Sequence, residues 1–411
     1  MASAWSGPDH EDDSWEGVRF ARLQIASGRV ARSPRGFRVE EPPWGRGRLA
    51  RDYGRRADVV PMKLLNVHPL PALLSVSAIP GYDHARAGML VAKATYQVVD
   101  GVAVLETQKP APILVKDTPT PFGDLPRDDT LRADPAFEVI LLGQAYAAGG
   151  KPCPTRTVSL SVGSVRRDML ITGDRVWEKT MFGHRLSQPK PFTIIPLTWA
   201  KAFGGQTAIE IDRESFIDVC DVRNAAGKGF DPEPHAKGMT AKLKSPKPYP
   251  RFDPTRHLPN VEHPHLAIKE WKDSPDPACW ASVPMTSSIH GLRIPVEPST
   301  PKAGPGLFHR AHPDWVLPRL PSAGTVVTAE GVTADGRWTF ALPALQVWLD
   351  ILAEGKEQQV QAVPQMLVLL PEERRFHLIY RAFFNVPNPA AVSTGSERVA
   401  RLRLAEGWAT P

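Results

Sequence analysis

The sequence predicts a mainly β protein, in which antiparallel hairpins form β-sandwich-like regions and long proline-rich loops connect them. Three observations lead to this fold class. Proline accounts for 43 of 411 residues, about twice its usual share of ~5%, and proline interrupts helices. Asp100-Gly101 stands between two β-branched runs, which is a strong signal for a hairpin turn. After Thr325, short apolar runs alternate with turn residues, as in antiparallel sheets.

The first 61 residues carry few apolar side chains and many arginines. An acidic patch, Glu11-Asp12-Asp13, precedes an arginine-rich segment from Arg19 to Arg56 with scattered glycine and proline. Because such a chain buries little apolar surface, residues 1–61 are predicted to be a disordered extension. Met62-Lys63-Leu64 resembles the ordinary start of a protein chain, so a gene-model artefact is the alternative interpretation of this extension.

Residues 62–320 are predicted to form one β region with long loops. Asp100-Gly101 joins two strands within Ala87 to Thr107, because both residues accept the positive φ of a type I′ turn. Further extended runs follow at Phe137 to Tyr146, Thr157 to Val162, Asp168 to Thr172 and Phe192 to Trp199. Residues 205–320 hold long polar stretches, repeated prolines and most of the histidines. Loops of this length are often functional, and the four prolines within 242–254 predict an extended segment.

Residues 321–411 are predicted to form a smaller C-terminal β region. The run from Leu345 to Leu352 also fits a helical stripe, but the turn Glu354-Gly355-Lys356 follows it after the length of a strand and favours β structure. The predicted strands here are Thr325 to Thr333, Arg337 to Leu342, Leu345 to Leu352, Gln358 to Val363, Met366 to Leu370 and Phe376 to Phe384.

Charge and composition argue against several classes of protein. The net charge of +6 is spread over the whole chain without a run of five basic residues, which does not favour a nucleic-acid partner. No stretch approaches the ~18 consecutive apolar residues of a membrane span, and the N-terminus lacks an apolar signal segment. A cytoplasmic protein with no membrane insertion is therefore expected. Three widely separated cysteines predict reduced thiols.

Spacings typical of catalysts and cofactor sites are missing. Neither G-x-S-x-G nor H-E-x-x-H occurs, and Gly227-Lys228-Gly229 lacks the spacing of a phosphate-binding loop. The sequence thus predicts no catalytic residues, no cofactor-binding residues and no cofactor. A hydrolase acting on carbohydrate or peptide stays open as an alternative, since Asp174, Asp212, Glu214 and Asp218 could converge in space.

Two groups of histidines have spacings found at metal sites. His312-Pro313-Asp314 has the H-x-D spacing of facial iron triads, which would need a second, distant histidine such as His377. His257, His263 and His265 form an H-x5-H-x-H group without the ligand pattern of a known site. Histidines in solvated loops are the simpler interpretation, so no metal site is predicted.

The segment Gly173-Asp174-Arg175-Val176-Trp177 is the most informative motif. Residues two apart on a strand share a face, so Arg175 could stack on Trp177 or hold a carboxylate in two parallel hydrogen bonds. A buried pair that closes a β corner is the favoured interpretation, and contact with a partner is the alternative. Ala202-Phe203-Gly204-Gly205 is interpreted as a turn with a core anchor, where paired glycines allow close backbone approach.

Four motifs in order resemble the bacterial family known as domain of unknown function 2169. They are G-D-R-x-W, P-x-P-F, A-F-G-G and N-x-x-G-x-G-F, and the resemblance runs from about Met62 to about Phe384. The candidate structural or partner-contact residues are Gly173, Asp174, Arg175, Trp177, Phe192, Trp199, Phe203, Gly204, Gly205, Asn224, Gly227, Gly229 and Phe230.

The resemblance implies a function that the residues by themselves do not. Members of this family are regarded as adaptors or chaperones that bind a secreted effector and load it onto the spike of a type VI secretion system. The expected function is therefore that of a non-enzymatic adaptor with two protein partners, the effector and the spike protein.

Overall fold

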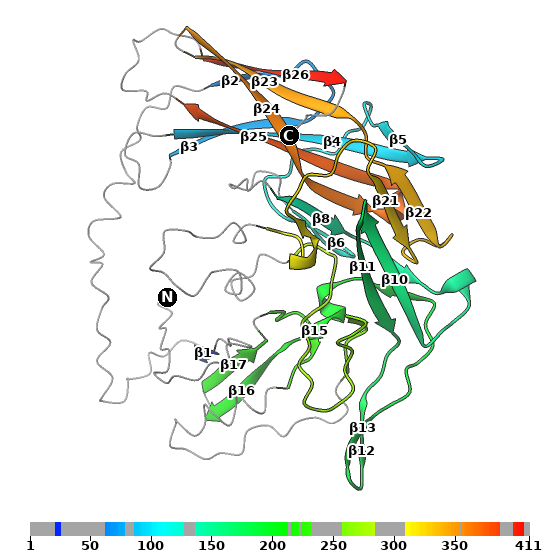
Figure 1. Ribbon diagram of the computed structural model, residues 1–411. Helices are drawn as coiled ribbons and strands as arrows, with labels where there is room; N and C mark the ends of the chain where they lie inside the picture. The colour runs from blue at the N-terminus through cyan, green and yellow to red at the C-terminus, as the bar shows by residue number, and fades with distance from the viewer. Residues whose placement is uncertain are drawn as a thin grey trace, which may run out of the picture.

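The structure is a computed structural model that describes residues 21–25, 62–78, 86–126, 136–212, 215–221, 223–231, 257–283, 309–353, 355–386 and 398–406 (Figure 1). Strands dominate these residues, which confirms the predicted mainly β class. Helical structure in them consists of short 3-10 turns: η1 (Ala148–Gly150), η2 (Trp199–Lys201), η5 (Pro313–Trp315) and η6 (Pro371–Glu373). Among the described residues, none of the helical segments has the length and apolarity needed to cross a membrane.

The strands in chain order are β1 (Ala21–Ile25), β2 (Lys63–Leu65), β3 (Ala72–Ala78), β4 (Arg86–Val99), β5 (Val102–Leu105), β6 (Thr118–Thr120), β7 (Gly123–Leu125), β8 (Phe137–Leu141), β9 (Gln144–Tyr146), β10 (Thr155–Val162), β11 (Val165–Thr172), β12 (Trp177–Thr180), β13 (Gly183–Leu186), β14 (Ile194–Pro196), β15 (Phe203–Gly204), β16 (Gln206–Asp212), β17 (Ser215–Cys220), β18 (Lys228–Gly229), β19 (Val261–Glu262), β20 (Val316–Leu317), β21 (Val326–Glu330), β22 (Arg337–Ala341), β23 (Leu345–Ala353), β24 (Lys356–Leu370), β25 (Arg375–Val386) and β26 (Val399–Glu406).

The largest sheet has ten strands and is built around β4, β24 and β25. Its main order is β2-β26-β23-β24-β25-β4-β3, with β5 on β4, β8 on β24 and β20 on β8. The predicted turn between β4 and β5 is confirmed, because Asp100 and Gly101 have φ values of 50° and 78°. Both residue types accept the positive φ that a tight hairpin turn needs.

A second sheet packs against the first through a column of aromatic rings. Its order is β19-β11-β10-β21-β22. Phe340 of β22 stacks on Phe376 of β25 with ring centroids 4.4 Å apart, and Tyr96 of β4 stacks on the same ring at 4.9 Å. One continuous apolar core includes residues of both sheets. Two facing sheets around a shared core are the sandwich arrangement that the hairpin pattern predicts.

The boundary predicted between residues 320 and 321 does not separate two sheets. β25 pairs with β4 over its whole length, and β8 pairs in parallel with β24. In the second sheet, β10 pairs with β21. Strands from both predicted regions therefore share each sheet, because pairing between distant strands leaves no local signal comparable to that of a hairpin.

Four further segments differ from the expectation or lie outside what the structure describes. The two runs predicted at 358–363 and 366–370 form one strand, β24, whose pairing with β25 shifts register between Pro364 and Met366. The run from Phe192 to Trp199 contains only the short strand β14. Within residues 1–61, β1 pairs with β17, while the rest of that extension lies outside the described residues, as does the segment 242–254. The three cysteines are free thiols.

His377 lies in the core of the large sheet, where its surroundings disfavour the protonated imidazole. It is 3% exposed, and its Nδ1 lies 3.2 Å from the Thr95 hydroxyl. Burial lowers the pKa of His377 well below its usual 6.5, and the charges of Lys93 and Arg375 lower it further. Below pH ~6.5 the unfolded chain binds a proton that the folded protein does not, so stability decreases as the pH falls.

We expect the free energy of unfolding to decrease between pH 7.5 and 5.5, and His377→Gln to reduce this decrease. Below pH ~6.5 the slope from one such histidine approaches about 1.4 kcal/mol per pH unit. Urea unfolding at both pH values measures it, with the exposed His265→Gln as control. Equal pH dependence in the wild type and His377→Gln would contradict this assignment.

Candidate functional site

The family motifs meet in a cluster of loops that we call the loop junction, formed by residues 199–205, 224–230 and 258–262. Asn224 lies at its centre, fully buried. Its side-chain amide donates to the carbonyl oxygens of Trp199 at 2.7 Å and Phe203 at 2.9 Å. The backbone carbonyl of Asn224 accepts a hydrogen bond from the Gly205 backbone amide at 2.8 Å. Short polar side chains that satisfy backbone groups in this way hold irregular segments together.

Glycines allow the backbones in the loop junction to approach closely. Gly204 has a φ of +137°, and a Cβ there would lie 2.1 Å from the Asn224 carbonyl oxygen. β15 and β18 therefore pair in parallel, with Gly204 opposite Gly229. Phe203 and Phe230 are buried beside them, at 3% and 2% exposure. Phe203 is the core anchor that the sequence predicted, but A-F-G-G contains the short strand β15 and not the predicted turn, because its glycines let the backbone pair with β18.

A polar group lies at the solvent edge of the loop junction. Lys228 donates to the Asn260 side-chain oxygen at 2.6 Å, and the Asn260 amide donates to Asp174 at 3.1 Å. The hydrogen bond from Asn260, followed by the charge of Lys228, lowers the pKa of Asp174 against a smaller opposing effect of burial. Burial and the charge of Lys201 lower the pKa of Lys228 to about 8. Asp212, Glu214 and Asp218, proposed above to converge with Asp174, have side chains outside the described residues.

Arg175 holds a buried carboxylate. It is 8% exposed and pairs with Glu262 of β19, which is 2% exposed. Glu262 also accepts from the Ile268 amide at 2.9 Å, and Arg175 reaches the Ile268 carbonyl at 3.5 Å. Burial raises the pKa of the Glu262 carboxyl, and the charge of Arg175 and the Ile268 amide offset part of this rise. The pair therefore fixes β19 to the end of β11.

Trp177 does not stack on Arg175 as predicted, but packs in an apolar cluster. It is 6% exposed in a small apolar cluster with Phe203, Leu258 and Ile268. Its ring meets Trp271 edge-on, with centroids 5.4 Å apart. The prediction assumed that two residues on the same face of an extended segment would contact each other. Instead, Arg175 pairs with the carboxylate of Glu262, and Trp177 packs against the ring of Trp271.

Trp177 begins a hairpin that we call the hairpin arm, formed by β12, β13 and the turn Met181-Phe182. It extends from the lower end of the molecule in Figure 1. Near the turn, where His184 lies opposite Lys179, its ring stacks on Trp271 with ring centroids 3.9 Å apart. The Thr180 hydroxyl donates to the Gly183 carbonyl at 3.0 Å and accepts from the Phe182 amide at 3.3 Å. The turn is thus ordered by local hydrogen bonds while its side chains point outward.

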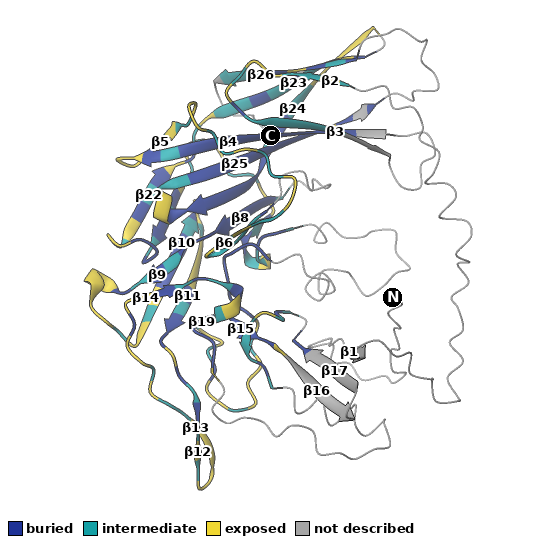
Figure 2. Ribbon diagram, turned by 180° about the vertical axis from the view of Figure 1, so that it is seen from behind, coloured by how far each residue is buried: buried dark blue, intermediate teal, exposed yellow. Residues whose placement is uncertain are grey.

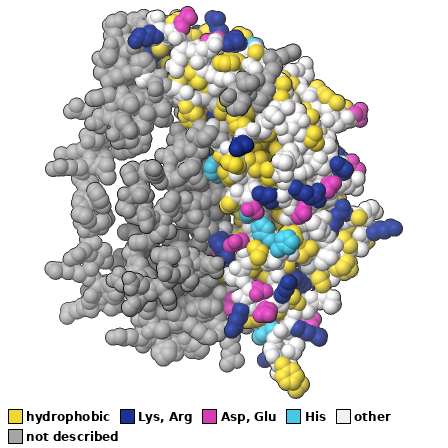
Figure 3. All heavy atoms as spheres, viewed as in Figure 1, with side chains coloured by type: hydrophobic (Ala, Val, Ile, Leu, Met, Phe, Trp, Pro, Cys, Tyr) yellow, Lys and Arg dark blue, Asp and Glu magenta, His cyan; other side chains and the backbone are white. Residues whose placement is uncertain are grey.

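The tip of the hairpin arm exposes two large apolar side chains. Met181 is 92% exposed and Phe182 is 97% exposed. The tip is coloured as exposed in Figure 2, and a hydrophobic group stands at the lower end of the molecule in Figure 3. Turns of two residues normally carry Gly, Asn, Asp or Ser. Apolar side chains here do not contribute to the fold, so their position favours contact with another molecule.

Sequence reasoning missed these two tip residues, although a signal for them existed. Thr180-Met181-Phe182-Gly183 is a turn sequence with apolar residues in the place of polar ones. By contrast, most of the predicted motif residues are buried. Trp199 donates from its indole to the Ala281 carbonyl at 3.0 Å, and Phe192 bridges to Cys153. The motif residues therefore form the buried base of the hairpin arm, whose exposed tip lies between the first two motifs in the sequence.

A second buried ionic network also lacked a sequence signal. Arg310, 1% exposed, makes two hydrogen bonds to Asp117 at 2.9 and 2.8 Å. Glu138 accepts from the Ala311 amide and pairs with His309 at 3.2 Å. Burial by itself would raise the pKa of Glu138, but the hydrogen bond and charge of His309, together with the Ala311 amide and the charge of Arg381, lower the pKa overall. This network fixes residues 309–311 against β8.

The two histidine groups of the sequence are partly brought together. His312 and Asp314 lie beside His263, whereas His377 is in the large sheet with Thr95. His257 forms a β bridge with Val176 instead. The histidine that lies beside His312 and Asp314 is thus His263, not the His377 named from the sequence.

One comparison with known proteins gives a match. A family model described as an uncharacterized protein conserved in bacteria (DUF2169) matches residues 83–381. No curated protein and no solved structure matches the chain. The match includes the loop junction and the hairpin arm and lies within the predicted limits of Met62 and Phe384. Since more than half of the chain is matched, the protein belongs to the bacterial DUF2169 family.

Proposed function

We propose that the protein is a cytoplasmic, non-enzymatic adaptor that binds a secreted effector protein and helps to load it onto a type VI secretion spike. The observation that carries this proposal is the hairpin arm, with Met181 and Phe182 almost fully exposed at its tip. Exposed apolar side chains on a supported projection are typical of contact sites for other proteins. The link to effectors and spikes rests on the resemblance to the adaptor family.

The hairpin arm has the properties of a binding anchor. Aromatic side chains such as that of Phe182 contribute strongly at the centres of interfaces, and Met adapts to irregular pockets. Trp177 at the base of the arm and His184 nearer the turn both pack against Trp271, so the arm is held at its base and along β13. A fixed base reduces the entropy lost on binding. In this proposal the tip inserts into a pocket of the effector.

Replacing both tip residues, Met181→Ser with Phe182→Ser, is expected to weaken effector binding by about 30-fold or more, the loss produced by one strong interface residue. Because both side chains are outside the core, the melting temperature should stay unchanged. Calorimetry with the effector encoded beside this gene measures the affinity. Val115→Ser, which removes a 65% exposed apolar side chain elsewhere, is the matched control.

Secretion assays extend the test to the cell. Deleting the gene should stop delivery of that one effector while the secretion apparatus still fires. The adaptor proposal fails if delivery continues and the wild-type protein forms no complex with effector or spike. If a complex forms and the tip variant binds as well as the control, the contact lies elsewhere on the protein.

A further inference from the structure

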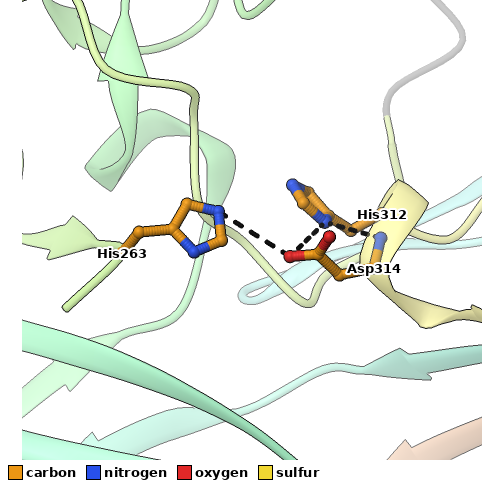
Figure 4. Close-up of side chains that lie close together, drawn as sticks. All are labelled: His263, His312 and Asp314. Carbon is orange, nitrogen blue, oxygen red and sulfur yellow. Dashed lines mark hydrogen bonds and ion pairs between the residues drawn. The ribbon is translucent and has the colours of Figure 1, made fainter. Parts of the chain in front are cut away.

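His263, His312 and Asp314 lie side by side and form a group of potential metal ligands (Figure 4). His263 Nε2 lies 3.8 Å from Asp314 Oδ2, and His312 Nδ1 lies 3.6 Å from the same oxygen. One ligand atom from each residue can be chosen so that all three lie within 4.8 Å of one another. His263 follows β19, and the other two residues flank the start of η5, so the group joins segments far apart in the sequence.

The hydrogen bonds of His312 direct one ring nitrogen toward the group. Its Nε2 lies 3.1 Å from the Pro277 carbonyl oxygen, which can only accept, so Nε2 carries the proton. Nδ1 is then the unprotonated nitrogen, and it accepts a long hydrogen bond of 3.2 Å from the Asp314 amide. A histidine that donates to a backbone carbonyl through one nitrogen has the tautomer of a metal ligand, and here the other nitrogen would bind the ion in exchange for the long hydrogen bond from the Asp314 amide.

The surrounding residues hold the two histidine-bearing segments in place. Glu262, next to His263, is fixed by Arg175 and the Ile268 amide. The His312 ring stacks on Trp199 with centroids 6.1 Å apart, and Trp199 is tied to Ala281 by its indole. The loop junction therefore holds both the hairpin arm and this group of three residues in place.

The distances suit a metal ion after a small adjustment. Metal–ligand distances of about 2.1 Å place neighbouring ligand atoms about 3.0–3.4 Å apart, and the observed separations, all within 4.8 Å, exceed this by at most about 1.8 Å. The side chains of His263 and Asp314 are 25% and 40% exposed, so they have room to rotate. That exposure also leaves one side of the group open to solvent.

We propose that His263, His312 and Asp314 bind one divalent transition-metal ion, with the remaining coordination positions open to water or a ligand. Two imidazoles and one carboxylate are the donor set of facial iron triads and of several zinc sites. This inference is independent of the adaptor function, because it rests on a different group of residues.

The test uses the full-length, tag-free protein after treatment with a chelator. Titration with Co²⁺, followed by visible absorption, and with Zn²⁺, followed by calorimetry, should give one ion per chain. Zn²⁺ should also raise the melting temperature, because an ion that binds only the folded protein stabilises it. His263→Gln and Asp314→Asn should each weaken binding by more than about 10–100-fold, the loss caused by removing an outer partner of a ligand.

His265→Gln is the matched control, since it removes an exposed imidazole two residues from His263 without touching the group. It should leave the affinity and the number of ions unchanged. Melting temperatures without metal verify that each variant is folded. The proposal is overturned if the wild type binds no ion more tightly than the His263→Gln and Asp314→Asn variants do, or if His265→Gln loses as much affinity as they do.

Discussion

Replacing Arg175 with methionine is expected to lower the free energy of unfolding by about 3–5 kcal/mol, because it leaves a buried carboxylate without its partner. Glu262 is 2% exposed, and the Ile268 amide and Thr172 hydroxyl are the other donors to it. Methionine retains most of the volume of the arginine stem, so loss of the charge dominates. Urea unfolding at pH 7.5 measures the effect.

Two further variants separate this effect from others. Arg175→Met combined with Glu262→Gln should recover part of the lost stability, since the buried charge is then gone. Arg185→Met, which breaks an exposed pair with Glu178, should change the stability little. If Arg175→Met unfolds like the wild type, the buried pair contributes nothing to the loop junction.

Gly204→Ala is expected to cost at least about 3 kcal/mol, from backbone strain of 1–3 kcal/mol and the loss of hydrogen bonds around Asn224. The φ of +137° is unfavourable for alanine, and its Cβ would overlap the Asn224 carbonyl oxygen at 2.1 Å. That carbonyl must then move away from the Gly205 amide. Hydrogen exchange followed by mass spectrometry should show faster exchange in residues 199–205 and 224–230.

Gly183→Ala is the control for Gly204→Ala. Gly183 has a similar φ of +130°, but a Cβ there would meet no atom within 4 Å. It therefore reports the backbone strain without the clash, and it should cost clearly less than Gly204→Ala. If both variants lose the same free energy of unfolding, the close approach of Gly204 to Asn224 does not contribute to stability.

Local patterns predicted the strands well because hairpins leave local signals. Asp100-Gly101 was predicted as a turn between strands, and both residues have positive φ. The alternation after Thr325 predicted β21, β22 and β23 within a few residues. The pairing of β4 with β25 had no such signal, since it depends on which distant apolar strand completes the core.

The candidate site was predictable in part. The motif residues were identified, but their role as a support became visible only when Asn224 was found between Trp199 and Phe203. Glu262 could not be recognised as the partner of Arg175, because a carboxylate 87 residues away gives no spacing signal. His263 was noted in one histidine group and His312 in another, and only the fold joins them.

The pairing of β4 with β25 also determines when the large sheet can be completed during translation. Thr95 of β4 and His377 of β25 are neighbours in the sheet but 282 residues apart in the chain. A ribosome adds about 5–20 residues per second, so β4 leaves the ribosome about 15–60 s before its partner. During that interval one edge of a strongly apolar strand is uncovered. Until β25 has been made, that edge can pair with other strands, so the last part of the chain to be translated also removes a site of aggregation.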